Sequence, residues 1–158
     1  LKGLFRMATP YLTMKSIPLL AVNHTYKEIG LFPKDIVGGG TGIYYSADNI
    51  WIVGRQQDKQ GSEIKGYHFI INVEKSRYVR EKSKIPISVS WEGGVEKYSG
   101  LLDVAMEGGY VEKPSAGWYQ RKGEENKVRE KETLNEEFWT PIFNDTNFKD
   151  YVKSRYAI

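Results

Sequence analysis

Residues 23–42 read NHTYKEIGLFPKDIVGGGTG, and this stretch decides how the rest of the chain is interpreted. The apolar residues 17–22 before it predict a buried strand, with Pro18 near its start, where a missing N–H is tolerated. Residues 43–47 after it predict a short helix. A connection this long between two regular elements is uncommon in a compact domain unless it is functional or disordered. We therefore expect a functional loop.

The glycines of this loop favour binding of an anion. Gly38, Gly39 and Gly40 have no side chains to cover their N–H groups, and a helix is predicted directly after them. Bare amides at a helix start suit a phosphate, and Lys27 and Lys34 add positive charge. We interpret the loop as a phosphate cradle for nucleic acid. A tight surface loop without a ligand is the alternative that the residues alone leave open.

Composition sets wide limits on the function. A chain of 158 residues fits one domain, or most of one with an appendage. Its net charge of +3 and pI near 8.9 permit nucleic-acid binding without requiring it. There is no cysteine, which excludes a disulfide framework and is compatible with an intracellular site. No apolar run is long enough to span a membrane, so no membrane partner is expected.

The first residues predict a helix that is already under way. Apolar side chains recur at helical spacing from Leu1 to Leu12, and Pro10 is expected to kink the helix. The helix leads straight into the predicted buried strand, which needs neighbouring strands. We therefore expect the chain to be a piece of a longer protein.

Three further strands are predicted in the middle of the chain, at residues 50–53, 67–73 and 85–91. The first is expected to end in a polar turn that runs through Gly61, and the last to turn back as a hairpin. If the second strand continues, Lys75 and Arg77 share one of its faces, about 6.5–7 Å apart. Such cations repel each other unless an anion lies near them. A solvated strand tip is the alternative that the residues alone favour.

The last third of the chain predicts small helices and a second hairpin. The predicted elements are a helix at 101–107 with Ser99 as N-cap and Gly108-Gly109 as its stop, a hairpin at 110–119, a flexible link at 121–132, a helix opened by a Thr133–Glu136 capping box and interrupted by Pro141, and a helix at 148–156.

No constellation of catalytic residues emerges from the residues alone. The chain has no Gly-x-x-x-x-Gly-Lys-Ser/Thr loop for a nucleotide. Its two histidines, His24 and His68, are too few without cysteine to suggest a zinc site. Asp48 and the other acidic residues are better explained as caps and solvated charges. An enzyme built from these residues alone is therefore not expected.

Several runs along the whole chain match one known pattern, in the same order. They are Ile17-Pro18, residues 23–26 (NHTY), Phe32-Pro33-Lys34, residues 38–48 (GGGTGIYYSAD), residues 73–77 (VEKSR), residues 81–84 (EKSK), residues 98–103 (YSGLLD), Gly117-Trp118-Tyr119, Phe138-Trp139-x-Pro141 and the helix at 148–156. In these runs the chain closely resembles the UvsX recombinases of tailed phages, the phage branch of the RecA family. The resemblance implies an α/β fold: the C-terminal half of a RecA-like ATPase core, a mixed twisted sheet with flanking helices, plus a small α+β C-terminal segment. The implied division is residues 1–112 for the partial core and 113–158 for the segment.

The resemblance also implies roles for individual residues. Residues 26–42 correspond to the second DNA-binding loop of the family, which holds single-stranded DNA at the filament axis. The implied DNA-binding residues are Tyr26, Lys27, Ile29 as an intercalating wedge, Lys34, and Gly39, Gly40 and Thr41 as amide donors to phosphates. His24 takes the position that senses the γ-phosphate, and Lys75 and Arg77 match cations that reach the ATP of a neighbouring subunit.

The function implied by the resemblance is ATP-dependent DNA recombination. The parent protein would form a filament on single-stranded DNA and drive pairing and strand exchange with homologous duplex DNA, with ATP and Mg²⁺ as cofactors, in the cytoplasm of a bacterial host. Mediator and single-strand-binding proteins are further expected partners. The Walker motifs and catalytic glutamate are expected upstream of Leu1, so the isolated chain should neither hold ATP normally nor hydrolyse it. A non-catalytic module that binds single strands or a recombinase is the alternative.

Overall fold

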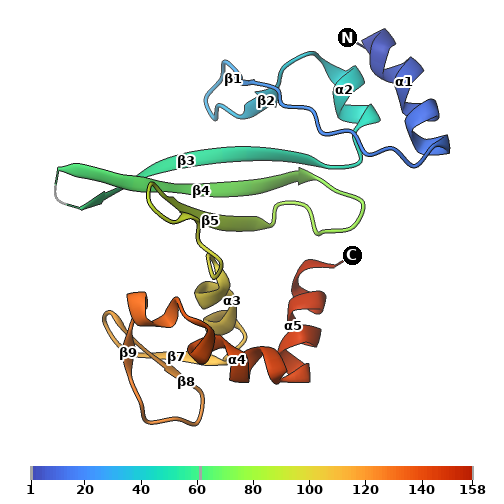
Figure 1. Ribbon diagram of the computed structural model, residues 1–158. Helices are drawn as coiled ribbons and strands as arrows, with labels where there is room; N and C mark the ends of the chain where they lie inside the picture. The colour runs from blue at the N-terminus through green and yellow to red at the C-terminus, as the bar shows by residue number, and fades with distance from the viewer. Residues whose placement is uncertain (1, 61, 158) are drawn as a thin grey trace.

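The computed structural model describes residues 2–60 and 62–157 as a mixed α/β chain with small antiparallel sheets (Figure 1). The helices are α1 (Lys2–Met14), α2 (Thr41–Ser46), α3 (Leu101–Glu107), α4 (Glu136–Asn144), α5 (Thr146–Tyr156) and the 3-10 helix η1 (Glu130–Thr133). The strands are β1 (Thr25–Lys27), β2 (Asp35–Val37), β3 (Ile50–Gln60), β4 (Glu63–Lys75), β5 (Lys84–Ser90), β6 (Gly94–Val95), β7 (Val111–Ser115), β8 (Trp118–Arg121) and β9 (Val128–Arg129).

The sheet β3-β4-β5-β6 forms the middle of the molecule in Figure 1. Gln56, His68 and Ser88 lie side by side across its three long strands. The predicted strands at 67–73 and 85–91 and the hairpin after them are confirmed. The strand predicted at 50–53 is confirmed but is longer than expected. The polar turn predicted to follow Gln57 is wrong up to Gln60, because β3 stays extended to that residue. Gly61, where the predicted turn ends, lies outside the described residues. Pairing with β4 along its length keeps these polar residues in the sheet.

The mixed α/β class is confirmed, but the arrangement of the strands differs from the expected core. Every strand pair among the described residues is antiparallel, so a mixed twisted sheet is not seen in this part of the chain. The buried strand predicted at 17–22 is wrong: the segment has no regular structure, and Val22 is 97% exposed. A buried strand needs hydrogen-bonding neighbours. No described strand pairs with this segment.

The core lies in the C-terminal part of the chain. Its buried members are Tyr98, Ala105, Val111, Tyr119, Phe138, Trp139, Ile142 and Phe148. Trp139 is fully buried and stacks on Tyr98 and Phe143, at ring-centroid distances of 6.2 and 5.8 Å. Its indole N–H donates to the carbonyl of Thr133 at 2.6 Å, so the polar edge of the ring is also satisfied.

The N-caps predicted in this part of the chain are wrong, although the helices and the glycine stop of α3 are confirmed. The interruption predicted at Pro141 is also wrong, because α4 runs through this residue to Asn144. Ser99 does not cap α3: its hydroxyl accepts from the Ser88 N–H and donates to the Glu96 carbonyl, which ties the helix connection to the sheet. Helix α4 is capped by Asn135, whose Oδ1 accepts from the Phe138 N–H at 2.8 Å. Thr133 is instead buried at the end of η1.

The link predicted as flexible at 121–132 is also partly wrong, because it contains β9 and most of η1. The guanidinium of Arg129 lies 3.9 Å from the centre of the Trp118 ring. Strand β9 pairs with β8 at this point. A cation on an aromatic face stabilises such a contact, and it orders a segment whose composition alone suggests a loop.

The end of α5 contacts the loop between β4 and β5, as Figure 1 shows. Val79 bridges to Ala157, and the Arg80 N–H donates to the Tyr156 carbonyl at 2.8 Å. Nearby, Arg155 pairs with Glu107 at 2.9 Å, and this hydrogen bond raises the pKa of the Arg155 guanidinium. The C-terminal helix is therefore attached both to α3 and to the loop between β4 and β5.

Candidate functional site

The predicted loop forms a hairpin that projects from the molecule beside α2 (Figure 1). Strands β1 and β2 pair in the register Thr25 with Val37 and Lys27 with Asp35. The Glu28 N–H donates to the Lys34 carbonyl at 2.8 Å and closes the base of the tip. A short irregular tip on paired strands positions its side chains away from the rest of the chain.

The tip of the hairpin exposes apolar side chains. Ile29, Leu31 and Phe32 are each at least 87% exposed, and Tyr26 on β1 is about half exposed, at 52%. Apolar side chains gathered on one exposed element are typical of a binding surface. Ile29, the predicted intercalating wedge, is fully exposed and meets no steric obstacle from this chain.

The two predicted lysines of the loop lie in different electrostatic surroundings. The Lys27 ammonium forms an ion pair with Asp35 at 2.8 Å, across the two strands of the hairpin. Lys34 is exposed near the tip. Because the pair with Asp35 offsets part of the charge of Lys27, Lys34 is the better placed of the two to meet a phosphate.

His24 connects the start of the loop to its end. The Gly38 N–H donates to the His24 carbonyl at 2.9 Å, and the Asn23 amide donates to the Gly38 carbonyl at 2.6 Å. A Cβ at Gly38 would come within 3.0 Å of the His24 ring nitrogen Nε2. A side chain at residue 38 would therefore require His24 to shift, so the glycine keeps these two residues in close contact.

The glycine cluster leads into α2 with a backbone that suits glycine. Gly39 and Gly40 have φ values of 92° and 78°, in the region that other residues rarely adopt. Gly40 is the N-cap of α2, and no side chain caps this end. Thr41 begins the helix and is exposed. The amides predicted to meet phosphates are thus at an uncapped helix start, as expected.

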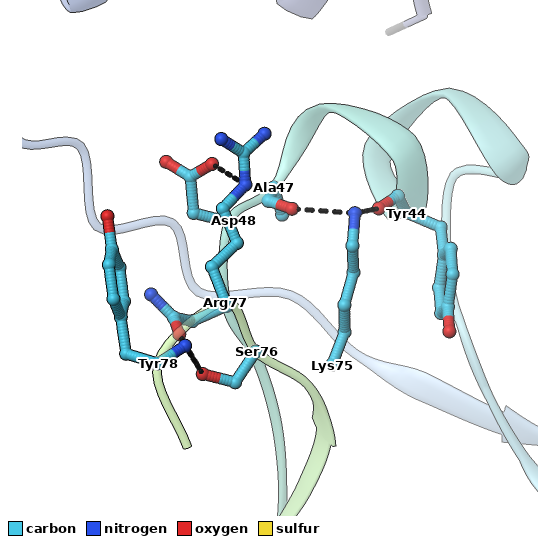
Figure 2. Close-up of polar contacts among 8 residues, drawn as sticks. Tyr44, Ala47, Asp48, Lys75, Ser76, Arg77 and Tyr78 are labelled. Carbon is cyan, nitrogen blue, oxygen red and sulfur yellow. Dashed lines mark hydrogen bonds and ion pairs between the residues drawn. The ribbon is translucent and has the colours of Figure 1, made fainter. Parts of the chain in front are cut away.

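Strand β4 ends at Lys75, so it does not continue through both predicted cations, and Arg77 lies in the bend that follows it. Both cations contact the last turn of α2 or the residues directly after it (Figure 2). The Lys75 ammonium donates to the carbonyls of Tyr44 and Ala47 at 2.8 and 2.9 Å, and it lies 5.4 Å from the centre of the Tyr44 ring. These carbonyls belong to the last turn of α2, where no helical partner is available. Lys75 therefore caps the helix that begins at the glycine cluster.

Arg77 is held by a carboxylate. Its Nε lies 2.9 Å from an Asp48 oxygen, and both side chains are more than half exposed. Between the two cations, Ser76 is buried and donates to the Asn49 side-chain oxygen at 2.7 Å. The Ser76 hydroxyl also accepts from the N–H groups of Tyr78 and Val79. The like charges at 75 and 77 are thus each compensated within the chain.

Sequence reasoning missed these partners. Asp48 is an anion of the site and not only a solvated charge, and Asn49 and Ser76 hold the two segments together. The contacts join residues 27 to 31 positions apart, and no local spacing reports such a pairing. Among the described residues, no cluster of side chains suits a metal ion, and no helix is long and apolar enough to cross a membrane.

Comparison with known proteins finds a relative that matches along the whole chain. The chain is 47% identical to the "Recombination and repair protein" of Enterobacteria phage T4, over 168 aligned positions that cover 100% of this chain. Residues 98–152 match the family described as "Bacteriophage T4, Recombination and repair protein, C-terminal domain". The chain belongs to the UvsX recombinases of the RecA family. It corresponds to their C-terminal region, as the sequence motifs indicate.

More distant members of the RecA family match part of the chain. "Protein RecA" of Syntrophus aciditrophicus is 25% identical over 75% of the chain, and "Protein RecA" of Staphylococcus aureus strain JH9 is 27% identical over 65% of it. The UvsX-type chain spans 43% of the length of the T4 protein, and 35% and 30% of these two RecA proteins.

Proposed function

We propose that this chain is the C-terminal part of an ATP-dependent recombinase that forms filaments on single-stranded DNA and drives homologous pairing and strand exchange. The observation that carries the proposal is the exposed hairpin with apolar and basic side chains, joined through the glycine cluster to α2. Helix α2 is in turn capped by Lys75. One continuous unit thus contains a surface suited to DNA and cations suited to phosphate.

In this proposal residues 1–112 belong to a RecA-like core and residues 113–158 to a C-terminal segment. The remaining strands of the mixed core sheet would come from the part of the recombinase that this chain does not include. They would pair with the exposed segment 17–22. The identity to the T4 protein along the whole chain, which spans 43% of that protein, supports a core that extends beyond this chain. The division at residue 112 stays a prediction.

The hairpin is the proposed DNA-binding element. Exposed Ile29 would insert between bases, and Tyr26 would stack on one of them. Lys34, and Lys27 once it leaves Asp35, would contact phosphates, while Gly39, Gly40 and Thr41 would donate backbone N–H groups. These contacts involve the DNA backbone and base faces, so the proposed binding does not depend strongly on sequence.

The end of β4 is the proposed contact with ATP and Mg²⁺ bound by a neighbouring subunit. Arg77 suits this role because its side chain is 66% exposed and its partner is a single exposed carboxylate. A guanidinium pairs strongly with phosphate oxygens. Lys75 lies on the same side, and His24 occupies the sensor position at the base of the loop. The filament itself, homologous duplex DNA, mediators and single-strand-binding proteins are the remaining proposed partners.

The proposal is tested in a chimera in which residues 1–158 replace the matching segment of the T4 protein. We expect the chimera to hydrolyse ATP when single-stranded DNA is present and to exchange strands with a homologous duplex. DNA binding that needs no nucleotide and stimulates no hydrolysis would contradict the proposal and favour the non-catalytic binding module.

A substitution in the same chimera tests the role of Arg77. The R77A variant should lose about 10³-fold in DNA-stimulated hydrolysis, the scale of a trans-acting arginine, and should still bind nucleotide within one subunit. R55A is the matched control, because Arg55 is an exposed arginine of β3 that lies over the Tyr67 ring. Normal turnover in R77A would exclude the trans contact.

A further inference from the structure

Lys75, the last residue of β4, and the two residues that follow it each hold a different part of the segment 44–49. Figure 2 shows the Lys75 side chain directed at the carbonyls of Tyr44 and Ala47, and the Arg77 side chain directed at Asp48. Between them, the Ser76 hydroxyl donates to the side-chain oxygen of Asn49. Lys75 and Arg77 are the cations assigned above to the ATP of a neighbouring subunit. Both are therefore engaged within their own chain when no neighbour is present.

The three contacts differ in how easily they can be exchanged. Ser76 is buried, at 8% exposure, and its hydroxyl makes three hydrogen bonds. The ammonium of Lys75 makes two hydrogen bonds to carbonyls and lies near an aromatic ring. Arg77 has one ionic contact, in a pair whose side chains are 66% and 59% exposed. The Arg77–Asp48 pair is the contact that solvent weakens most.

The Asp48 carboxylate has the chemistry of the group that Arg77 would bind in a filament. It is an oxyanion placed 2.9 Å from the guanidinium, as a phosphate oxygen would be in a charge-assisted hydrogen bond. A triphosphate with its bound cation carries more oxygens and can accept in two places from one guanidinium. The two anions cannot occupy the Nε–H of Arg77 at the same time.

We propose that Asp48 is a built-in competitor for Arg77. This inference rests on the trans role of Arg77 proposed above. The Asp48 carboxylate holds the Arg77 guanidinium until the triphosphate of a neighbouring subunit displaces it. Filament assembly then exchanges one ion pair inside the subunit for one across the interface. Asp48 thereby raises the nucleotide concentration that assembly requires, and Ser76 keeps the two segments in place during the exchange.

The test compares variants of Asp48 in the full-length chimera. The readout is the concentration of a slowly hydrolysed ATP analogue that gives half-maximal filament assembly on single-stranded DNA. The variant D48N replaces the carboxylate with an uncharged group of the same shape. Because an exposed ion pair contributes little, we expect this concentration to fall about two- to fivefold. D48E keeps a carboxylate and should require a nucleotide concentration close to that of the parent chimera.

Glu74→Gln is the matched control for charge. Glu74 is an exposed carboxylate on β4 near the same cations, and E74Q removes the same charge without touching the Arg77 pair. If the nucleotide concentration for half-maximal assembly falls equally in E74Q and D48N, the effect comes from removing any nearby negative charge. That result would overturn the competitor role. An unchanged or higher requirement in D48N would overturn it as well.

The two proposals fail in different ways. If R77A keeps normal turnover, the trans contact fails, and the role of Asp48 fails with it. If R77A loses hydrolysis while D48N behaves like the parent chimera, the trans contact stands and only the competitor role is wrong.

Discussion

Apolar side chains are buried in one region of this chain and exposed in another. From Tyr98 to Phe148 the aromatic and aliphatic residues form one buried cluster around Trp139. From Ile17 to Phe32 the apolar residues are exposed, several of them almost fully. The exposed stretch is the richer of the two in such residues, so hydrophobicity alone does not decide which region is buried.

The two regions differ in whether neighbouring helices and strands pack against their apolar side chains. In the C-terminal region α3, α4, α5 and the small sheet β7-β8-β9 supply neighbours for each other within about sixty residues of sequence. The segment 17–32 has no packed layer of this kind among the described residues, and its hairpin carries charge beside its apolar tip. The first region is built for stability, and the second is suited to contact something else.

The largest expected effect is on the stability of the buried cluster around Trp139. Trp139→Ala removes a fully buried ring and leaves the Thr133 carbonyl without its donor, so the free energy of unfolding should fall by about 3–5 kcal/mol. Urea denaturation of the chimera, followed by circular dichroism, measures the change. Phe32→Ala in the exposed hairpin is the matched control and should change stability by less than about 0.5 kcal/mol. Equal losses in both variants would show that the two regions do not differ in this way.

A smaller effect tests whether the packed region also depends on its local helix signals. Asn135→Ala removes the side-chain acceptor for the Phe138 N–H, and we expect a loss of about 1 kcal/mol in unfolding free energy. The same denaturation experiment applies, with Asn126→Ala in the exposed irregular segment before β9 as control. A cost in N126A as large as that in N135A would contradict the cap assignment.

The smallest effect on folding is expected in the hairpin, where the change should appear in binding instead. Lys34→Ala should leave the thermal midpoint unchanged and reduce the salt dependence of single-stranded DNA binding by about 0.7 in log–log slope, the value for one phosphate. Fluorescence anisotropy at several salt concentrations measures the slope. Lys59→Ala, at the far end of β3, removes the same charge away from the hairpin. A variant K34A that binds with an unchanged slope would remove Lys34 from the interface.

Local patterns predicted most of the regular elements. Helical spacing before Leu12 marks α1, β-prone residues mark β4 and β5, and Gly108-Gly109 ends α3 as expected. The caps were less predictable, because Ser99 and Thr133 match the local pattern and yet bond elsewhere. Tertiary contacts decide which of several nearby polar side chains reaches a free N–H.

For the candidate site, spacing placed Lys75 and Arg77 near each other but could not name their partners. From the residues alone, a solvated strand tip is the favoured interpretation of the two cations, and an anion near them is the other possibility. The structure supplies Asp48 for one and helix carbonyls for the other. These partners come from a segment of the chain that precedes β3, so only the β3–β4 pairing brings them together.

The sequence by itself determined the family, the position of the hairpin loop and the glycines that α2 requires, because these depend on short motifs and local backbone preferences. Tertiary structure alone decided that residues 17–22 are exposed, that Asn135 caps α4 and that Asp48 holds Arg77. The first and last outcomes depend on which distant segment is present to bury a side chain or to pair with a charge. The cap falls to Asn135 because Thr133 is buried in η1. Local preferences report neither.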